Sequence, residues 1–312
     1  MIELILAAGK AGVELALFVL LPVMIVMLVI MRLLEARNIL SLLVHYLSPV
    51  LRPLGIPGLG IFALLQIMLV SFAAPVATLS MMNKNGTSQR HIAATLALVL
   101  SAAQANVVFP MSAMGLDAGF TFIVALLAAL FAAAVTYHIF ARHLPEEVEP
   151  QTVETDEPPH NEIKDVSSTL TVINSAGREA FELAINAIPM LVLALLLVNI
   201  LQEVGAMELL GLLLSPLLWL LGYPDIAVLP IVSKYIAGGT AMMGVSAEYL
   251  QQDLLTTDTF NRMAGFLIQP FDIVGIALLA TAGTRVAAVM RPAIYGALVG
   301  IMARVLIHGL WY

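Results

Sequence analysis

The chain has 312 residues, of which 61% are hydrophobic and only 11% are charged. Soluble domains are about 45–50% apolar and about 25% charged, so the composition excludes an ordinary soluble protein and predicts an integral membrane protein. The net charge of −7 comes from residues 144–165, which hold eight acidic side chains and one lysine; it therefore indicates no nucleic-acid partner. The absence of cysteine excludes disulfides, thiolate metal sites and thiol nucleophiles.

Eight apolar segments are long enough to cross the lipid bilayer, which takes roughly 20 residues of helix. They are residues 13–31, 59–82, 92–114 and 119–141 in the first half, and 181–201, 226–247, 263–283 and 292–310 in the second. The run 11–31 is too long for the core of a cleavable signal peptide, so we expect it to contain the first transmembrane helix. Two shorter apolar stretches, 40–54 and 207–221, leave the number of membrane segments at eight or ten.

The two halves of the chain are related in sequence. Leu-Gly-Ile-Pro at 54–57 recurs as Leu-Gly-Tyr-Pro at 221–224, and Ser-Pro at 48–49 recurs at 215–216. The same offset of 167 residues carries Pro22 onto Pro189. Self-similarity at one offset indicates an internal duplication. We therefore divide the chain into a first repeat (1–143), an acidic, proline-rich linker (144–169) and a second repeat (170–312).

The basic residues bear on the orientation of these repeats, because they favour the cytoplasmic side of a membrane. Arg32, Arg37 and Arg52 assign the connection after the first span to that side. The later basic residues lie on the same side only if 59–82 turns back within the membrane; these are Lys84, Arg90 and Arg142. Each half would then cross an odd number of times, which inverts one repeat relative to the other. We expect an all-α polytopic membrane protein with two inverted repeats of four or five segments, each containing a broken or re-entrant helix.

Two apolar segments contain helix breaks at corresponding positions. In the first repeat Ser71 and Pro75 lie mid-segment, and proline removes an amide donor and clashes with the preceding turn. In the second, Gly238-Gly239-Thr240 lies at the matching place. Unwound backbone at membrane depth is tolerated only where it is buried in protein or lines a cavity, so the paired breaks favour a binding site. The alternative is that these small residues only allow close helix packing.

Lys234 and Asp272 are the clearest charges inside apolar segments. Ionisable groups at membrane depth are costly, so they pair with each other or contact a substrate or ion. They could form a structural salt bridge, or Lys234 could extend its ammonium to the membrane surface. Alternatively, Asp272 could bind a substrate hydroxyl or a coupling cation, Na⁺ or H⁺, with Lys234 as its switchable partner. Gln269 is three residues before Asp272, which predicts that both lie on one helical face. Gln104 and Asn106 occupy the corresponding segment of the first repeat and could bind a polar solute or join helices.

The order of these motifs resembles that of the nucleoside-recognition, or Gate, domain membrane proteins. In the second half the resemblance runs from Leu-Gly-Tyr-Pro at 221–224 through Ala-Gly-Gly-Thr-Ala at 237–241 to Ala-Gly-Phe-Leu at 264–267. It implies kinship with concentrative nucleoside transporters, the membrane domain of the ferrous-iron transporter and the spore-maturation proteins. The lack of a GTPase domain and of every cysteine argues against iron transport.

Together these features predict a secondary transporter, a symporter of the bacterial cytoplasmic membrane, for a small polar solute such as a nucleoside or nucleobase. The predicted substrate-binding residues between the repeats are Ser71, Gln104, Asn106, Gly239, Thr240 and Gln269, with Lys234 and Asp272 for ion coupling. The alternative is a non-transporting membrane scaffold or partner subunit of the spore-maturation type. No nucleophile–base set indicates an enzyme, no cofactor is expected beyond the coupling ion, and a homo-oligomer is possible.

Overall fold

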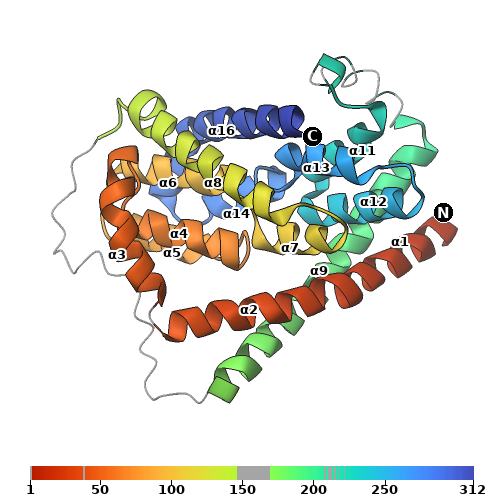
Figure 1. Ribbon diagram of the computed structural model, residues 1–312, viewed down its shortest axis with the longest axis horizontal. Helices are drawn as coiled ribbons and strands as arrows, with labels where there is room; N and C mark the ends of the chain where they lie inside the picture. Colours follow the sequence, from red (N-terminus) through yellow and green to blue (C-terminus); the bar gives the residue numbers. More distant parts are fainter. Residues whose placement is uncertain are drawn as a thin grey trace.

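A computed structural model of the chain describes residues 2–37, 39–145, 169–206 and 222–312, together with 209, 213, 216 and 218–220. All regular structure in these residues is helical (Figure 1). Most of the acidic linker and most of the stretch 207–221 lie outside the described residues.

The helices of the two halves follow one another in a similar order. The first half contains α1 (Ile2–Glu14), η1 (Leu15–Leu20), α2 (Leu21–Ala36), α3 (Ile39–Leu51), η2 (Arg52–Leu54), α4 (Gly58–Leu69), α5 (Pro75–Lys84), α6 (Gln89–Ser101), α7 (Ala105–Ala113), α8 (Ala118–Val135) and η3 (Thr136–Phe140). The second contains α9 (Thr169–Glu203), η4 (Asp225–Ala227), α11 (Val228–Ala237), α12 (Gly239–Gln251), α13 (Thr257–Leu267), α14 (Ile273–Ala280), α15 (Thr284–Ala288) and α16 (Met290–Trp311).

Several predicted spans are pairs of short helices. Within the described residues, three helical stretches are long and apolar enough to cross a membrane: Gln89–Ala113, Ala118–Phe140 and Met290–Trp311. The segments 59–82, 226–247 and 263–283 are instead split into α4 and α5, α11 and α12, and α13 and α14. The sequence predicts the first two breaks. It does not predict the break between α13 and α14, although Pro270 lies there, or the interruption between α6 and α7, where the sequence Ala-Ala-Gln at 102–104 contains neither glycine nor proline.

The two copies of the Leu-Gly-x-Pro sequence have the same backbone conformation. Gly55 and Gly222 have φ angles of 79° and 77°, in the left-handed region that favours glycine. The amide of Gly55 donates to the carbonyl of Arg52 over 2.9 Å, and that of Gly222 donates to Trp219 over the same distance. In both copies a proline and then a new helical segment follow. The shared sequence therefore encodes one turn, used twice.

Small residues allow the last helix to pack deep in the protein. Helix α16 contacts α6, α8 and α13 and lies along them in Figure 1. A Cβ atom on Gly300 would lie 2.6 Å from the carbonyl oxygen of Ala128 in α8, and one on Gly265 would lie 2.8 Å from Cα of Val305. Contacts this close are typical of helices in membranes, where small residues let backbones approach. They bring the polar residues of α16 to the centre of the fold.

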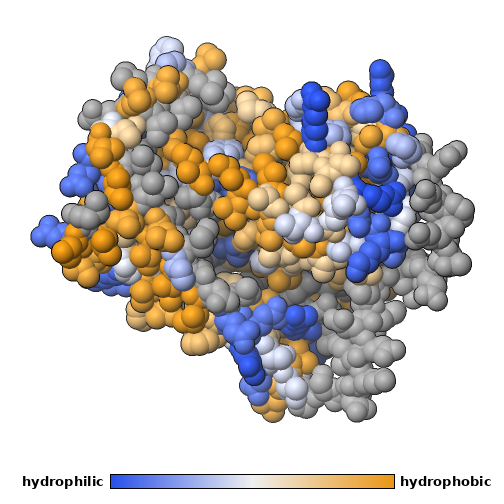
Figure 2. All heavy atoms as spheres, turned by 180° about the vertical axis from the view of Figure 1, so that it is seen from behind, coloured by the Kyte–Doolittle hydropathy of each residue, from blue (hydrophilic) through white to orange (hydrophobic). Residues whose placement is uncertain are grey.

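The outer faces of α8 and α16 are apolar. Ile123, Leu127 and Phe131 of α8 are 63%, 58% and 48% exposed, and they follow one another at helical spacing. Figure 2 shows apolar residues over much of the face seen from behind, with hydrophilic residues gathered in patches. Continuous exposed apolar surface of this extent marks contact with lipid or another protein, and it fits an integral membrane protein.

The packing of α16 on α8 predicts that Gly300→Ala destabilises the protein by about 1–3 kcal/mol, the usual cost of overpacking a close contact. Gly177→Ala in α9 is the matched control, because a Cβ atom on Gly177 would have no neighbouring atom within 4 Å and alanine is the better helix former. Thermal unfolding of both variants in detergent measures the difference. Equal melting temperatures for the two variants would contradict the close packing.

Candidate functional site

Three helix breaks cross near the centre of the protein. The backbone amide of Gln104, just before α7, donates to the carbonyl of Ile268, just after α13, over 2.8 Å. Gly239 begins α12, and a Cβ atom on it would lie 2.7 Å from Val107 Cγ2 and 4.0 Å from Gln104 Nε2. The breaks between α6 and α7, α11 and α12, and α13 and α14 therefore meet. Each break exposes backbone donors or acceptors that must find partners inside the protein.

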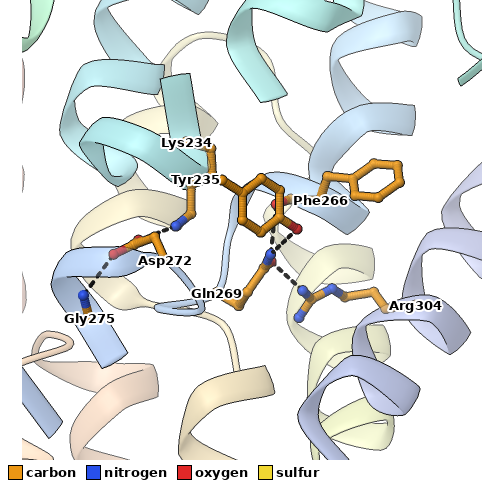
Figure 3. Close-up of polar contacts among 7 residues, drawn as sticks. All are labelled: Lys234, Tyr235, Phe266, Gln269, Asp272, Gly275 and Arg304. Atoms are coloured by element: carbon orange, nitrogen blue, oxygen red, sulfur yellow. Dashed lines mark hydrogen bonds and ion pairs between the residues drawn. The ribbon is translucent and has the colours of Figure 1, made fainter. Parts of the chain in front are cut away.

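A buried ion pair joins two of these breaks. The ammonium of Lys234, in the last turn of α11, bonds to Oδ2 of Asp272, and their side chains are 0% and 6% exposed. Oδ1 of Asp272 accepts the amide of Gly275 over 2.7 Å and so caps the N-terminus of α14. Figure 3 shows the carboxylate between these two partners. A cation at a helix C-terminus and an anion at a helix N-terminus both match the helix dipole.

Arg304 of α16 forms a second group of buried polar contacts beside the ion pair (Figure 3). Its guanidinium is fully buried and donates to the carbonyls of Ser101 and Gly265 over 2.5 and 3.0 Å. It also donates to Oε1 of Gln269. Among the described residues no carboxylate forms an ion pair with it. Ser101 ends α6 and Gly265 is near the end of α13, so the negative ends of two helix dipoles compensate the buried charge.

Gln269 connects Arg304 to α11. Its Nε2 donates to the hydroxyl of Tyr235 over 3.1 Å and to the carbonyl of Phe266 over 2.7 Å. With Oε1 bonded to Arg304, this amide uses both donors and an acceptor within the protein. Gln269 was predicted to bind substrate, and the structure places it in a network that positions Arg304 and Tyr235.

The structure corrects the prediction that Gln269 and Asp272 lie on one helical face. Both residues lie between α13, which ends at Leu267, and α14, which begins at Ile273. Asp272 caps α14, and an N-cap residue stands outside the helix that it begins. Gln104 likewise precedes α7, whereas Asn106 lies in its first turn. Residues three apart share a face only within a continuous helix, whereas α13 ends at Leu267 and Pro270, which lacks an amide donor, lies in the connection to α14.

Three buried polar atoms near the breaks have no hydrogen-bond partner among the described residues: Gln104 Nε2, Asn106 Oδ1 and Ser233 Oγ. Gln104 and Ser233 are 3% and 2% exposed. Buried polar groups are nearly always bonded to protein or to ordered water. Atoms left over in this way are candidates for contact with a polar ligand.

The remaining predicted residues fall in two places. Gly238 and Thr240 belong to the α11–α12 break, next to Gln104 and the ion pair. Ser71 and Pro75 belong to the α4–α5 pair, in which Pro75 is the first residue of α5. Helix α5 packs against α14, the helix that Asp272 caps, but no hydrogen bond described in the structure joins Ser71 to the residues of the other breaks.

Arg304 is the buried charged residue of this site that was not predicted from the sequence. It lies within the predicted span 292–310 and obeys the same rule that singled out Lys234, namely that a charge inside an apolar segment has a specific partner.

In the part of the chain that the structure describes, no three His, Asp or Glu side chains come together as metal ligands.

Comparison with known proteins agrees with this architecture. Residues 184–306 match the family model described as "Gate: Nucleoside recognition", whereas no curated protein matches the chain by sequence. The solved structure of CNTnw, a concentrative nucleoside transporter, in an inward-facing substrate-bound state superposes with a TM-score of 0.70 at 19% identity, covering 99% of this chain and 83% of that one.

Other states of CNTnw give similar values. A variant in an outward-facing state has a TM-score of 0.67 at 18% identity, covering 99% and 83% of the two chains. A variant in an intermediate state has a TM-score of 0.69 at 19% identity, covering 100% and 85%. At this identity the likeness concerns the fold. Residues 184–306, which contain the α11–α12 and α13–α14 breaks, thus match the Gate nucleoside-recognition model, and the chain as a whole has the fold of CNTnw.

Proposed function

We propose that the protein is a secondary transporter of a small polar organic solute, a nucleoside or nucleobase in the first instance. The observation that carries this proposal is the crossing of three helix breaks, where buried atoms such as Gln104 Nε2 have no partner among the described residues. Discontinuous helices at the midplane are the usual substrate sites of secondary transporters. The Gate match and the fold of CNTnw support the same function. We place the site between the two repeats, in a bacterial cytoplasmic membrane.

The ion pair of Lys234 and Asp272 is the proposed coupling element, and a proton is the ion that suits it. Both oxygens of Asp272 are occupied, one by the ammonium of Lys234 and one by the amide of Gly275. Na⁺ would have to displace a tethered, buried ammonium from the carboxylate. A proton from the outer solution can instead bind the carboxylate of Asp272, which breaks the ion pair. Release of that proton to the inner solution lets the pair re-form, so one proton is carried per cycle.

Uptake into proteoliposomes tests this function. We expect accumulation of at least one labelled nucleoside or nucleobase, stimulated by a pH gradient that is acidic outside and unaffected by a Na⁺ gradient alone. Stimulation by Na⁺ at constant pH would overturn the choice of the proton. If the folded protein neither binds nor accumulates any solute of the panel, the transporter proposal fails and the scaffold of the spore-maturation type takes its place.

Substitutions of the ion pair separate its structural role from coupling. Lys234→Met or Asp272→Asn alone leaves an uncompensated buried charge or an unpaired polar group, which costs about 3–5 kcal/mol. The double variant removes both charges, so it regains most of the lost thermal stability, while its uptake no longer depends on pH. Lys10→Met is the control, because Lys10 pairs with Glu14 at the surface, with side chains 79% and 57% exposed, and such pairs contribute little. Unchanged pH dependence in a folded double variant would exclude the pair from coupling.

We also propose that the two repeats are inverted, which predicts the sides on which three segments lie. Each half then crosses the membrane an odd number of times, so the linker lies opposite both termini. Because the chain has no cysteine, single cysteines at Glu3, Asn161 and Tyr312 can be labelled with a membrane-impermeant maleimide in oriented vesicles. The expected result is labelling of Glu3→Cys and Tyr312→Cys from one side and Asn161→Cys from the other. Labelling of all three from one side would favour parallel repeats.

A further inference from the structure

We propose that the solute is an organic anion, and that its negatively charged oxygen binds at the N-terminus of α12, beside Gly238. This inference rests on the proposed transport function and names the substrate class for the same site. It follows from the charges at the helix ends, from one buried amide and from the open space next to Gly238.

Most helix ends at the crossing already carry a compensating charge. Lys234 lies at the C-terminal end of α11, and Asp272 caps the N-terminus of α14. Arg304 bonds to carbonyls at the ends of α6 and α13. Each helix end carries roughly half an elementary charge, so these four ends are balanced within the protein.

The N-termini of α7 and α12 are not balanced in this way. Neither helix has an acidic residue in its first turn, and neither has a side-chain cap. Gly238, which precedes α12, has no side chain that could cap it. The first amides of both helices therefore present partial positive charge and free donors, as helix N-termini do in anion sites.

Gln104 supplies an independent pointer to a ligand at this place. Its side chain is 3% exposed, and Nε2 has no hydrogen-bond partner among the described residues. This nitrogen lies 4.0 Å from the position that a Cβ atom on Gly239, the first residue of α12, would take. A buried N–H donor thus lies close to the same helix end, and an acceptor oxygen that bonds to both would satisfy them.

There is room for that oxygen beside Gly238. Gly238 is buried, yet a Cβ atom on it would have no neighbouring atom within 4 Å, whereas one on Gly239 would meet Val107 Cγ2. The φ angle of Gly238 is 88°, so other residues are strained there and the space stays open. A charged oxygen gains more than a neutral carbonyl from two helix ends and an amide, because charge-assisted hydrogen bonds are roughly twice as strong.

The test compares two ligands that share a ring and differ in charge, uracil and its 6-carboxylate, orotate. Calorimetric titration of the purified full-length protein is expected to give at least about tenfold tighter binding of orotate, and Gln104→Met is expected to weaken orotate about tenfold, the ratio that a charged hydrogen bond typically gives. Gln251→Met, at an exposed position in the same helix as Gly239, is the matched control and should bind orotate like the unaltered protein.

A second measurement keeps the test valid if Gln104→Met does not fold. Thr240→Cys, in the first turn of α12, is alkylated with a maleimide in the otherwise cysteine-free protein, and orotate should slow the reaction while uracil at equal concentration should not. Equal binding or protection by uracil, or unchanged orotate affinity in folded Gln104→Met, would overturn the anion inference. Uptake of neutral nucleosides with no effect of orotate would overturn it too and leave the transport function intact. Failure of every solute to bind would overturn both.

Discussion

The buried guanidinium of Arg304 holds the centre of this protein together. It bonds to the carbonyls of Ser101 and Gly265 and to the side chain of Gln269, and so ties α16 to the ends of two helices. Carbonyls at a helix C-terminus lack partners within the helix, and in an apolar surrounding each would be costly to leave unbonded. One side chain satisfies two such ends. The small residues of α16 allow close packing, and this packing brings the charge of Arg304 to the buried carbonyls. The close packing and the hydrogen bonding of these carbonyls therefore depend on each other.

In each half a polar residue precedes the helix that follows a break, but the two residues make different contacts. Gln104 stands directly before α7 and Asp272 directly before α14, at equivalent places in the order of helices. Asp272 caps its helix and pairs with Lys234, so its hydrogen-bonding capacity is used within the protein. Gln104 makes no cap, and its amide nitrogen faces Gly239 without a partner among the described residues. In the function proposed above, the Lys234–Asp272 pair of the second half acts in coupling, and Gln104 of the first half contacts the ligand.

The Gate match includes one of these two positions and not the other. The match covers residues 184–306, which contain Lys234, Gln269, Asp272 and Arg304. It does not cover Gln104, which comes from the other half of the chain and completes the crossing through its bond to Ile268. A site with contributions from both halves changes when the halves move relative to one another. That property is what alternating access requires of a transporter.

The amino-acid sequence by itself determined the membrane character, the turns at Gly55 and Gly222, and the helix breaks at Pro75 and Gly238. These features depend on local chemistry: mean apolarity, the left-handed conformation that favours glycine, and the missing amide of proline. The rarity of charge in apolar segments was also enough to single out Lys234 and Asp272 as potential partners. Only the tertiary structure decided that α13 ends before Gln269, that Arg304 lies between helix ends, and that Gln104 faces Gly239. Those facts arise from contacts between residues more than thirty positions apart, because a buried helix end takes whichever donor or acceptor the packing of distant helices brings to it.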